Sequence, residues 1–267
     1  MPLLNIKGTD LYYEDQGTGD ETIVFAHSLL FNCRMFDDQV RVLRDRYRCV
    51  TFDFRGQGRS EVTRDGYDMD TLADDAANLF QHLNCAPCHF LGFSMGGFVA
   101  LRLAIHQPGL LHSLILVATS ADPEPQENLS NYKLLNFLTR WIGPKVVANQ
   151  VMPIMFSEGF LTDPARASVR DEWRQHFLNN NKVGVSKAVS GVISREGVYD
   201  SLADIELPTL ILAGENDIAT TPDKSERMHA SIPNSRIVTI PNTGHMSPVE
   251  EPEAVNSAIV DFLASLA

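Results

Sequence analysis

The strongest constraint on the fold lies at residues 88–105, where the apolar run CHFL is followed by GFSMGG and then by the helix-forming run VALRLAI. The order is strand, tight turn, helix. A serine in such a turn presents its hydroxyl beyond the strand end, at the start of a helix. Gly92 and Gly96 make room for the turn, because a side chain at either position would collide with the neighbouring helix or strand. A Gly/Ser-rich loop is the alternative, but this context favours a nucleophile elbow with Ser94 as the nucleophile.

The segments around this unit alternate between apolar and amphipathic runs. Strands are predicted at residues 3–7, 10–15, 22–26, 48–52, 88–91, 112–118, 209–213 and 236–240. Helices are predicted at residues 35–46, 71–83, 99–105, 222–230 and 252–266. The alternation predicts an α/β fold with a doubly wound, mostly parallel sheet, and the first two strands form a hairpin at one edge.

The alternation stops after residue 120. Residues 121–201 show helical periodicity and no convincing strand, which predicts a helical lid inserted into a core domain of residues 1–120 and 202–267. The apolar residues of this insertion indicate either an apolar acyl or alcohol site or the lid's own core. They include Leu134, Phe137, Trp141, Val146, Met152, Met155, Trp173 and Phe177.

Charge and cysteine content limit the partners and the compartment. The formal net charge of −12 argues against nucleic acid and anionic membrane surfaces as partners. No stretch reaches the roughly 18 apolar residues of a membrane span. Four cysteines are too few to cross-link this chain with disulfides. We therefore expect a cytoplasmic protein. The C-x-x-C run at residues 85–88 precedes a strand, whereas redox pairs begin helices, so neither redox chemistry nor a metal is expected there. The pattern leaves the oligomeric state open.

A serine nucleophile needs a base and an acid, because its hydroxyl is weakly nucleophilic until an imidazole takes the proton. Among eight histidines, His245 is the best placed, because it follows the strand at 236–240, where open α/β sheets position their sites. Two carboxylates, Glu215 and Asp217, follow the strand that ends at residue 213. Asp217 is the better candidate, although it could also be a turn or helix-capping aspartate.

Further motifs carry a family resemblance. DFRGQGRS at residues 53–60, GEND at 214–217 and GH at 244–245 follow one another around the elbow. Together they resemble the α/β-hydrolase superfamily over nearly the whole chain, and the resemblance aligns the acid with Asp217. The two glycines at 56 and 58 do not indicate a dinucleotide site, because Glu61 stands where a third glycine is needed.

An oxyanion hole of the expected kind takes one amide from the residue after the serine and one from an early loop. These are the backbone N–H groups of Met95 and Leu29. The early loop reads AHSLL at residues 26–30, and Ser28 replaces the glycine of related enzymes. Because backbone amides do the stabilising, this replacement is compatible with activity.

The resemblance implies acyl transfer to water through an acyl-serine, with no metal and no organic cofactor. Ser94 excludes the branches with an aspartate nucleophile. Within the superfamily, residues 28–29 and 207–222 are similar to 3-oxoadipate enol-lactonases and small carboxylesterases. The leading hypothesis is hydrolysis of small, largely apolar carboxylic esters or lactones. The alternatives are a 3-oxoadipate enol-lactonase, a carbon–carbon bond hydrolase or perhydrolase, and a hydrolase-like receptor with slow turnover.

The charge of the substrate separates the first two hypotheses. A substrate carboxylate buried under an apolar lid needs a cation. Arginines near the oxyanion loop or in the insertion are candidates, although solvated surface is their default role: Arg34, Arg140, Arg166, Arg174 and Arg195. A neutral substrate is therefore favoured.

Overall fold

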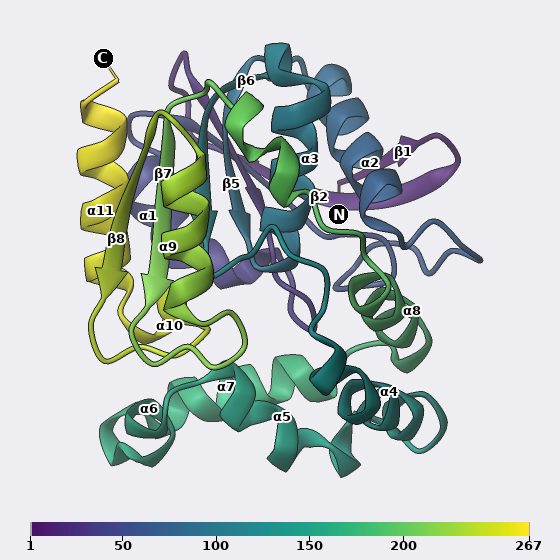
Figure 1. Ribbon diagram of the computed structural model, residues 1–267. Coiled ribbons are helices and arrows are strands. Elements are labelled where there is room, and N and C mark those ends of the chain that lie inside the picture. Colours follow the sequence, from purple (N-terminus) through teal and green to yellow (C-terminus); the bar gives the residue numbers. More distant parts are fainter. Residues whose placement is uncertain (1, 267) are drawn as a thin grey trace.

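Residues 2–266 are described in the computed structural model of the chain. Their strands form one sheet in the order β1-β2-β4-β3-β5-β6-β7-β8 (Figure 1). The strands are β1 (Leu3–Ile6), β2 (Thr9–Gln16), β3 (Thr22–Ala26), β4 (Arg48–Phe52), β5 (Cys88–Phe93), β6 (Leu111–Val117), β7 (Thr209–Gly214) and β8 (Ser235–Ile240). The two pairings of β2 are antiparallel and every other pairing is parallel. The predicted mostly parallel sheet with an edge hairpin is confirmed.

Helices cover both faces of this sheet. Strands β3, β5 and β7 are buried at every residue, as expected for strands covered on both sides. Helices α1 (Asp37–Leu43) and α11 (Pro252–Ala264) contribute to one core, and α2 (Met69–His82), α3 (Met95–His106) and α9 (Pro222–Ser231) contribute to the other. The carboxyl ends of the parallel strands therefore share one edge, where α/β sheets bind their ligands.

Three helix starts differ from the predicted ones: α3 begins at Met95 instead of residue 99, and side-chain caps explain the other two. The predicted helix at 35–46 is a 3-10 turn, η1 (Cys33–Phe36), followed by the shorter α1, because the Asn32 side chain accepts the amide of Arg34 and caps the turn. Helix α2 begins two residues early, because Asp68 caps it through the amide of Thr71. Short turns and one short helix complete these layers: η2 (Pro108–Leu110), η5 (Tyr199–Asp204) and α10 (Ser247–Glu250).

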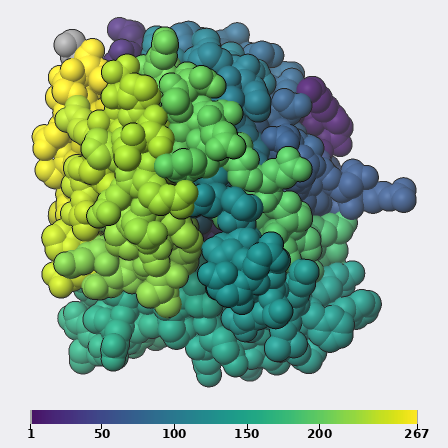
Figure 2. All heavy atoms as spheres, viewed as in Figure 1, coloured from purple at the N-terminus to yellow at the C-terminus, as the bar shows by residue number. Residues whose placement is uncertain are grey.

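A helical segment without strands lies between β6 and β7 in the described chain. Its elements are α4 (Gln126–Trp141), η3 (Pro144–Val146), α5 (Ala148–Met155), α6 (Glu158–Thr162), η4 (Pro164–Arg166), α7 (Ala167–Leu178) and α8 (Lys182–Ile193). It lies across the carboxyl edge of the sheet (Figure 1), and its teal and green atoms form the base of the molecule in Figure 2. The segment therefore covers the edge at which α/β sheets bind their ligands.

The two parts of the segment are packed differently. Helices α5 to α7 share a core with the sheet, in which Trp173 stands edge-on to Phe31 at a ring distance of 5.4 Å. Helix α4 packs against α8, and Thr139 is its one buried residue. An assignment to the lid core therefore fits Met155, Trp173 and Phe177. It is wrong for Leu134, Phe137, Trp141 and Val146, which are exposed because they lie on a face of α4 and η3 that no other element of residues 2–266 covers.

The C-x-x-C run lies inside the fold. Cys85 and Cys88 are buried free thiols. Burial raises the pKa of Cys85 to about 11 and raises the pKa of Cys88 well above its usual range, so the reactive thiolate is disfavoured at both. No helix within residues 2–266 combines the length and apolarity needed to cross a bilayer.

Candidate active site

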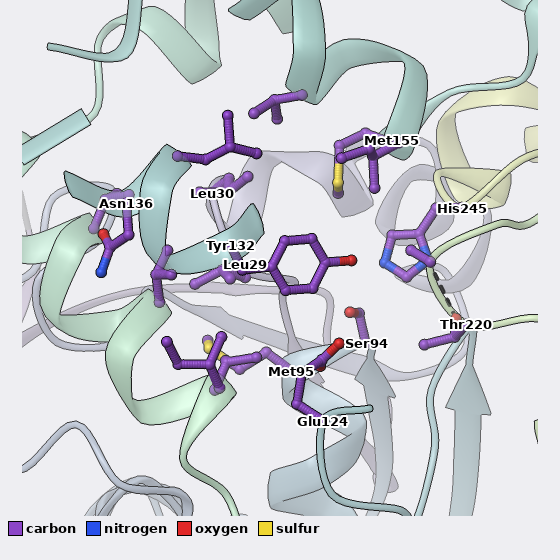
Figure 3. A pocket seen from close by; sticks show the side chains of 18 of the residues that line it. Leu29, Leu30, Ser94, Met95, Glu124, Tyr132, Asn136, Met155, Thr220 and His245 are labelled. Atoms are coloured by element: carbon purple, nitrogen blue, oxygen red, sulfur yellow. Dashed lines mark hydrogen bonds between the residues drawn. The ribbon is translucent and has the colours of Figure 1, made fainter. Parts of the chain in front are cut away.

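Ser94 lies in a strained turn between β5 and α3. Its φ of 50° and ψ of −108° fall outside the regions that non-glycine residues favour. The flanking glycines are sterically required: a Cβ at Gly92 would lie 2.4 Å from the carbonyl oxygen of Gly96, and a Cβ at Gly96 would lie 2.1 Å from that of Ala26. Thr119 Oγ1 donates to the Ser94 carbonyl at 2.8 Å, and Ser94 lines a cavity (Figure 3). The local geometry is that of the expected elbow.

The structure brings His245 and Asp217 together at the ends of neighbouring strands. Asp217 follows β7 and His245 follows β8, and His245 Nδ1 lies 2.8 Å from Asp217 Oδ2. An ionised carboxylate only accepts, so Nδ1 carries the proton and Nε2 is left as the acceptor. His245 lines the same cavity as Ser94. The pair thus leaves an acceptor nitrogen on a ring that lines the same cavity as the candidate nucleophile.

Three further donors hold the Asp217 carboxylate. The amides of Ala219 and Thr220 donate to Oδ1 at 2.8 and 3.0 Å, and Thr220 Oγ1 donates to Oδ2 at 2.8 Å. Burial by itself would raise the pKa of Asp217, but the charge and hydrogen bond of His245 and the bonds from Thr220 outweigh it and hold this pKa below its usual range. Thr220 was not predicted as a site residue; the D-x-x-T spacing, typical of a capping turn, is the signal that could have found it.

Glu215 and Asp217 have different roles in this loop. Glu215 is exposed, and its Oε2 accepts the amide of Asn242 at 2.8 Å. It supports the turn that follows β8, at which Asn242 has a φ of 58°. The preference for Asp217 over Glu215 as the partner of His245 agrees with this geometry.

Leu29 and Met95, which carry the two expected oxyanion donors, line the same cavity as Ser94. Met95 is the first residue of α3, so its amide has no partner within the helix. Within residues 2–266 the amide of Leu29 is bonded to no acceptor. In this loop Leu30 has a positive φ, of 75°, and Ser28 does not. Ser28 therefore needs no left-handed conformation, and a serine is accommodated there in place of glycine. Gln57, which sequence reasoning missed, fixes the loop by accepting the amide of Leu30 at 2.9 Å.

The cavity between the sheet and the helical segment has a volume of about 140 Å³. This is close to the roughly 150 Å³ of an engineered cavity that holds benzene. Most of the lining is apolar, and half of the lining residues come from α4, α5 and α8, including Leu135, Val151 and Val189. Tyr132 and Glu124 point into it near Ser94 (Figure 3). The space therefore suits a small, mostly apolar group attached to the reacting carbon.

One buried ion pair lines the cavity. Arg195 Nη1 lies 2.8 Å from Glu124 Oε2, and both side chains are at most one-tenth exposed. Arg195 also donates to the carbonyls of Asp122 and Val192. The other candidate arginines are engaged elsewhere: Arg34 with Asp37, Arg166 with Glu251, Arg174 with Asn149 and Arg140 over the ring of Trp141. Among the described residues that line the cavity, Arg195 is therefore the one Lys or Arg side chain, and Glu124 neutralises it.

A second buried carboxylate, Glu250, supports the loop that carries His245. It accepts the amide of Gly244 at 3.1 Å, the amide of Ser157 at 3.3 Å and Ser157 Oγ at 2.5 Å. Burial raises its pKa, although these hydrogen bonds oppose the rise. Glu250 therefore ties the histidine loop to the start of α6. No motif pointed to it, because its partners lie on two different loops.

We expect Glu250→Ala to lower the free energy of unfolding by about 3 kcal/mol, because it leaves several buried donors without an acceptor. The pKa of Glu250 is higher in the folded protein than its unfolded value near 4.5. Ionisation of Glu250 therefore destabilises the folded protein at high pH, and this cost disappears as the pH falls. The deficit of the variant should therefore be larger at pH 4.5 than at pH 8. Urea denaturation at both pH values measures it. Glu226→Ala, an exposed change on α9, should stay within about 0.5 kcal/mol; an equal deficit there would contradict the role of Glu250.

Comparison with known proteins agrees with this fold and geometry. A family model described as alpha/beta hydrolase fold matches residues 21–252, and the chain belongs to that family of enzymes. It is 31% identical over 265 residues to 3-oxoadipate enol-lactonase 1 of Acinetobacter baylyi, covering 99% of this chain and 97% of the relative. It is therefore a member of the α/β-hydrolase superfamily with an enol-lactonase among its relatives.

Two solved structures extend the comparison to esterases. A thermophilic esterase from Thermogutta terrifontis superposes with a TM-score of 0.90 at 33% identity, covering 97% of this chain and 94% of the esterase. The enol-lactonase from Burkholderia xenovorans LB400 superposes with a TM-score of 0.92 at 26% identity, covering 98% and 100%. The chain is thus similar to esterases and to enol-lactonases over nearly its whole length.

Proposed function

We propose that the protein is a carboxylesterase-type serine hydrolase that cleaves esters or lactones of small, neutral, largely apolar substrates. One observation carries the proposal: Ser94, in its strained turn, lines one small apolar cavity together with His245, whose Nδ1 is held by Asp217. Nucleophile, base and acid then occupy the order and roles of a catalytic triad. The esterase and enol-lactonase relatives support the same reaction class.

In the proposed mechanism, His245 Nε2 takes the proton of Ser94 Oγ as that oxygen attacks the ester carbonyl carbon. The amides of Leu29 and Met95 donate to the resulting oxyanion, and Asp217 stabilises the imidazolium. His245 then protonates the leaving alcohol oxygen, which yields the acyl-serine. Water, deprotonated by His245, attacks the acyl carbon, and His245 then returns the proton to Ser94 Oγ as the acyl carbon–Oγ bond breaks and the acid is released. These steps need neither a metal nor an organic cofactor.

We further propose that residues 121–201 act as the lid of this site, inserted into a core of residues 1–120 and 202–267. Helices α4, α5 and α8 supply much of the cavity lining, which supports this division. In an apolar cavity that excludes water, donors aimed at a developing oxyanion are worth more than in water. The segment thus shapes the cavity and excludes water from it, and the core contributes the reacting groups.

The charge of the cavity favours a neutral substrate over an anionic enol-lactone. Arg195 is the cation that lines it, and Glu124 already neutralises that charge. A substrate carboxylate there would meet Glu124 as well as Arg195 and would gain little from the pair. Enol-lactone hydrolysis is the second candidate, because Arg195 is in the cavity and relatives carry that name.

The test is a screen of neutral esters of graded acyl length, simple lactones and 3-oxoadipate enol-lactone. We expect short neutral esters to show the highest kcat/KM, and an added acyl carboxylate to lower it. A kcat/KM for the enol-lactone far above that of every neutral ester, removed selectively by Arg195→Ala, would establish the second candidate. Absence of turnover with all of these substrates would refute both.

We expect Glu124→Gln to improve the use of anionic substrates, because it frees the Arg195 charge to pair with a substrate carboxylate. The gain in kcat/KM for a carboxylate-bearing ester over its neutral isostere should be about tenfold to a hundredfold, the worth of a hydrogen bond to a charged group. The double change with Arg195→Gln should abolish this gain. Glu127→Gln, the same change at an exposed position of α4, is the control and should leave the ratio unchanged.

A further inference from the structure

Five apolar side chains lie exposed on the outer surface of α4 and the turn after it. We call them the α4 patch. Their exposed fractions are 56% for Leu134, 59% for Phe137, 65% for Trp141, 64% for Ile142 and 46% for Val146. The first three are spaced by three and four residues, so they share one face of the helix. The rings of Phe137 and Trp141 lie 6.4 Å apart, and η3, which carries Val146, packs against α4. Leu134, Phe137 and Trp141 therefore form one surface, and Ile142 and Val146 follow at its C-terminal end.

The charged residues that flank the α4 patch in the sequence are all positive. Lys133, Arg140 and Lys145 lie beside it in the sequence, and residues 128–157 contain no Asp or Glu, although the chain has 34 acidic residues. Within residues 2–266 none of the three cations forms an ion pair, and Arg140 rests over the ring of Trp141. An apolar surface bordered by unpaired cations is complementary to an apolar surface bordered by anions.

We propose that the α4 patch docks on an anionic phospholipid surface. The apolar side chains would enter the boundary between headgroups and acyl chains, and the three cations would lie at the lipid phosphates. Trp, Phe and Leu on one face with Lys and Arg at its borders is the composition of helices that lie in a bilayer interface. Each cation near such a surface strengthens binding by about fivefold.

The net charge of −12 does not prevent this binding. At physiological ionic strength the Debye length is about 8 Å, so acidic groups farther than that from the lipid are largely screened. The charge that the lipid meets is that of the patch and its borders. The expectation that anionic membranes are poor partners applies to the rest of the surface, and the α4 patch is the exception.

Two features favour lipid over a second copy of the chain. A two-fold contact through this patch would bring the same cations of both copies close together, which is repulsive. The opposite side of α4 carries Tyr132, Leu135 and Asn136, which line the cavity. Docking through α4 therefore places the cavity beside the medium into which apolar esters partition. The binding itself does not depend on the function proposed above.

The first test is flotation of the full chain with vesicles of phosphatidylcholine alone or mixed with phosphatidylglycerol. We expect binding to the anionic vesicles, weak binding to the neutral ones, and release at high salt. Tryptophan emission gives a second readout, because Trp141 is 65% exposed and Trp173, the other tryptophan, is 7% exposed. Emission should shift to shorter wavelength on binding, and Trp141→Phe should abolish the shift. No binding to the anionic vesicles overturns the proposal.

Matched variants separate the apolar from the charged contribution. Phe137→Ser with Trp141→Ser should weaken vesicle binding at least about a hundredfold, or about tenfold for each aromatic side chain. Lys133→Gln with Lys145→Gln should remove most of the preference for anionic lipid. Leu3→Ser and Val42→Ser, at exposed apolar positions on β1 and α1, should change nothing.

Two further measurements test whether the variants act through lipid binding alone. All variants should hydrolyse a small water-soluble ester at the wild-type rate, because none of the changed residues lines the cavity. This readout also shows whether the proposed function fails independently of lipid binding. Light scattering decides the alternative: a concentration-dependent dimer that the aromatic double variant abolishes, without vesicle binding by the wild type, would assign the patch to a second copy and overturn the proposal.

Discussion

We expect Ser94→Ala to lower kcat for ester hydrolysis by about 10⁶-fold, the loss seen when a triad loses its nucleophile. The fold should be unchanged. Alanine keeps the Cβ that the turn at φ 50° already accommodates, and the lost hydroxyl lines the cavity instead of packing in the core. Steady-state kinetics with a p-nitrophenyl ester measures the loss, and circular dichroism and thermal unfolding check the fold.

The control for this prediction is Ser190→Ala, an exposed serine of α8 outside the cavity, which should retain the wild-type rate. A folded Ser94→Ala protein with a tenth of the wild-type kcat would disprove the assignment of the nucleophile. A partial loss of that size would indicate that Ser94 affects only the shape of the site.

We expect His245→Ala to be about as damaging as Ser94→Ala, and Asp217→Asn to be milder, with a loss of about 10⁴-fold in kcat. The imidazole moves the proton, whereas the carboxylate orients the ring and stabilises its charged form. The double variant of Ser94 and His245 should lose no more than either single variant, because the residues act as one unit. Glu215→Gln should be close to wild type, and a greater loss there than in Asp217→Asn would show that the acid is misassigned.

The Asp217→Asn substitution should also change how the free energy of unfolding depends on pH. The pKa of this carboxyl is lowered in the folded protein, so its ionised form stabilises the fold above the unfolded pKa near 3.8, and that contribution is lost as the pH falls through the folded pKa. The stability difference between wild type and Asp217→Asn should therefore be full at pH 7 and should shrink below about pH 3.8. Denaturation curves across this range measure it. A difference that grows on acidification would contradict the direction of the shift.

The local parts of the site could be predicted from sequence. The turn at Ser94 is marked by its own glycines, and β3 and β5 are marked by continuous apolar runs. The positions of Asp217 and His245 follow from topology, because residues after neighbouring parallel strands meet at one edge. These inferences need only short windows of sequence and the rule for parallel sheets.

The remaining parts depend on contacts between distant segments. Arg195 and Glu124 lie 71 residues apart, and Glu250 and Ser157 lie 93 residues apart. Neither pairing leaves a local pattern. Helical spacing placed Leu134 and Trp141 on one face of a helix, but it could not show that no other element covers this face. Whether a side chain is buried depends on the neighbouring elements, and the sequence of one helix does not specify these.

The uneven attachment of the helical segment has a consequence for how such an enzyme could diversify. The stretch from α5 to α7 shares its core with the sheet and is tied to the histidine loop through Glu250, so changes there would disturb the reacting groups. Helix α4 buries one residue and still presents Tyr132 and Asn136 to the cavity. Substitutions at weakly buried positions usually alter stability by less than about 0.5 kcal/mol. Selection on α4 can therefore reshape substrate preference while catalysis and folding stay intact, and libraries restricted to this helix are the economical route to new specificities.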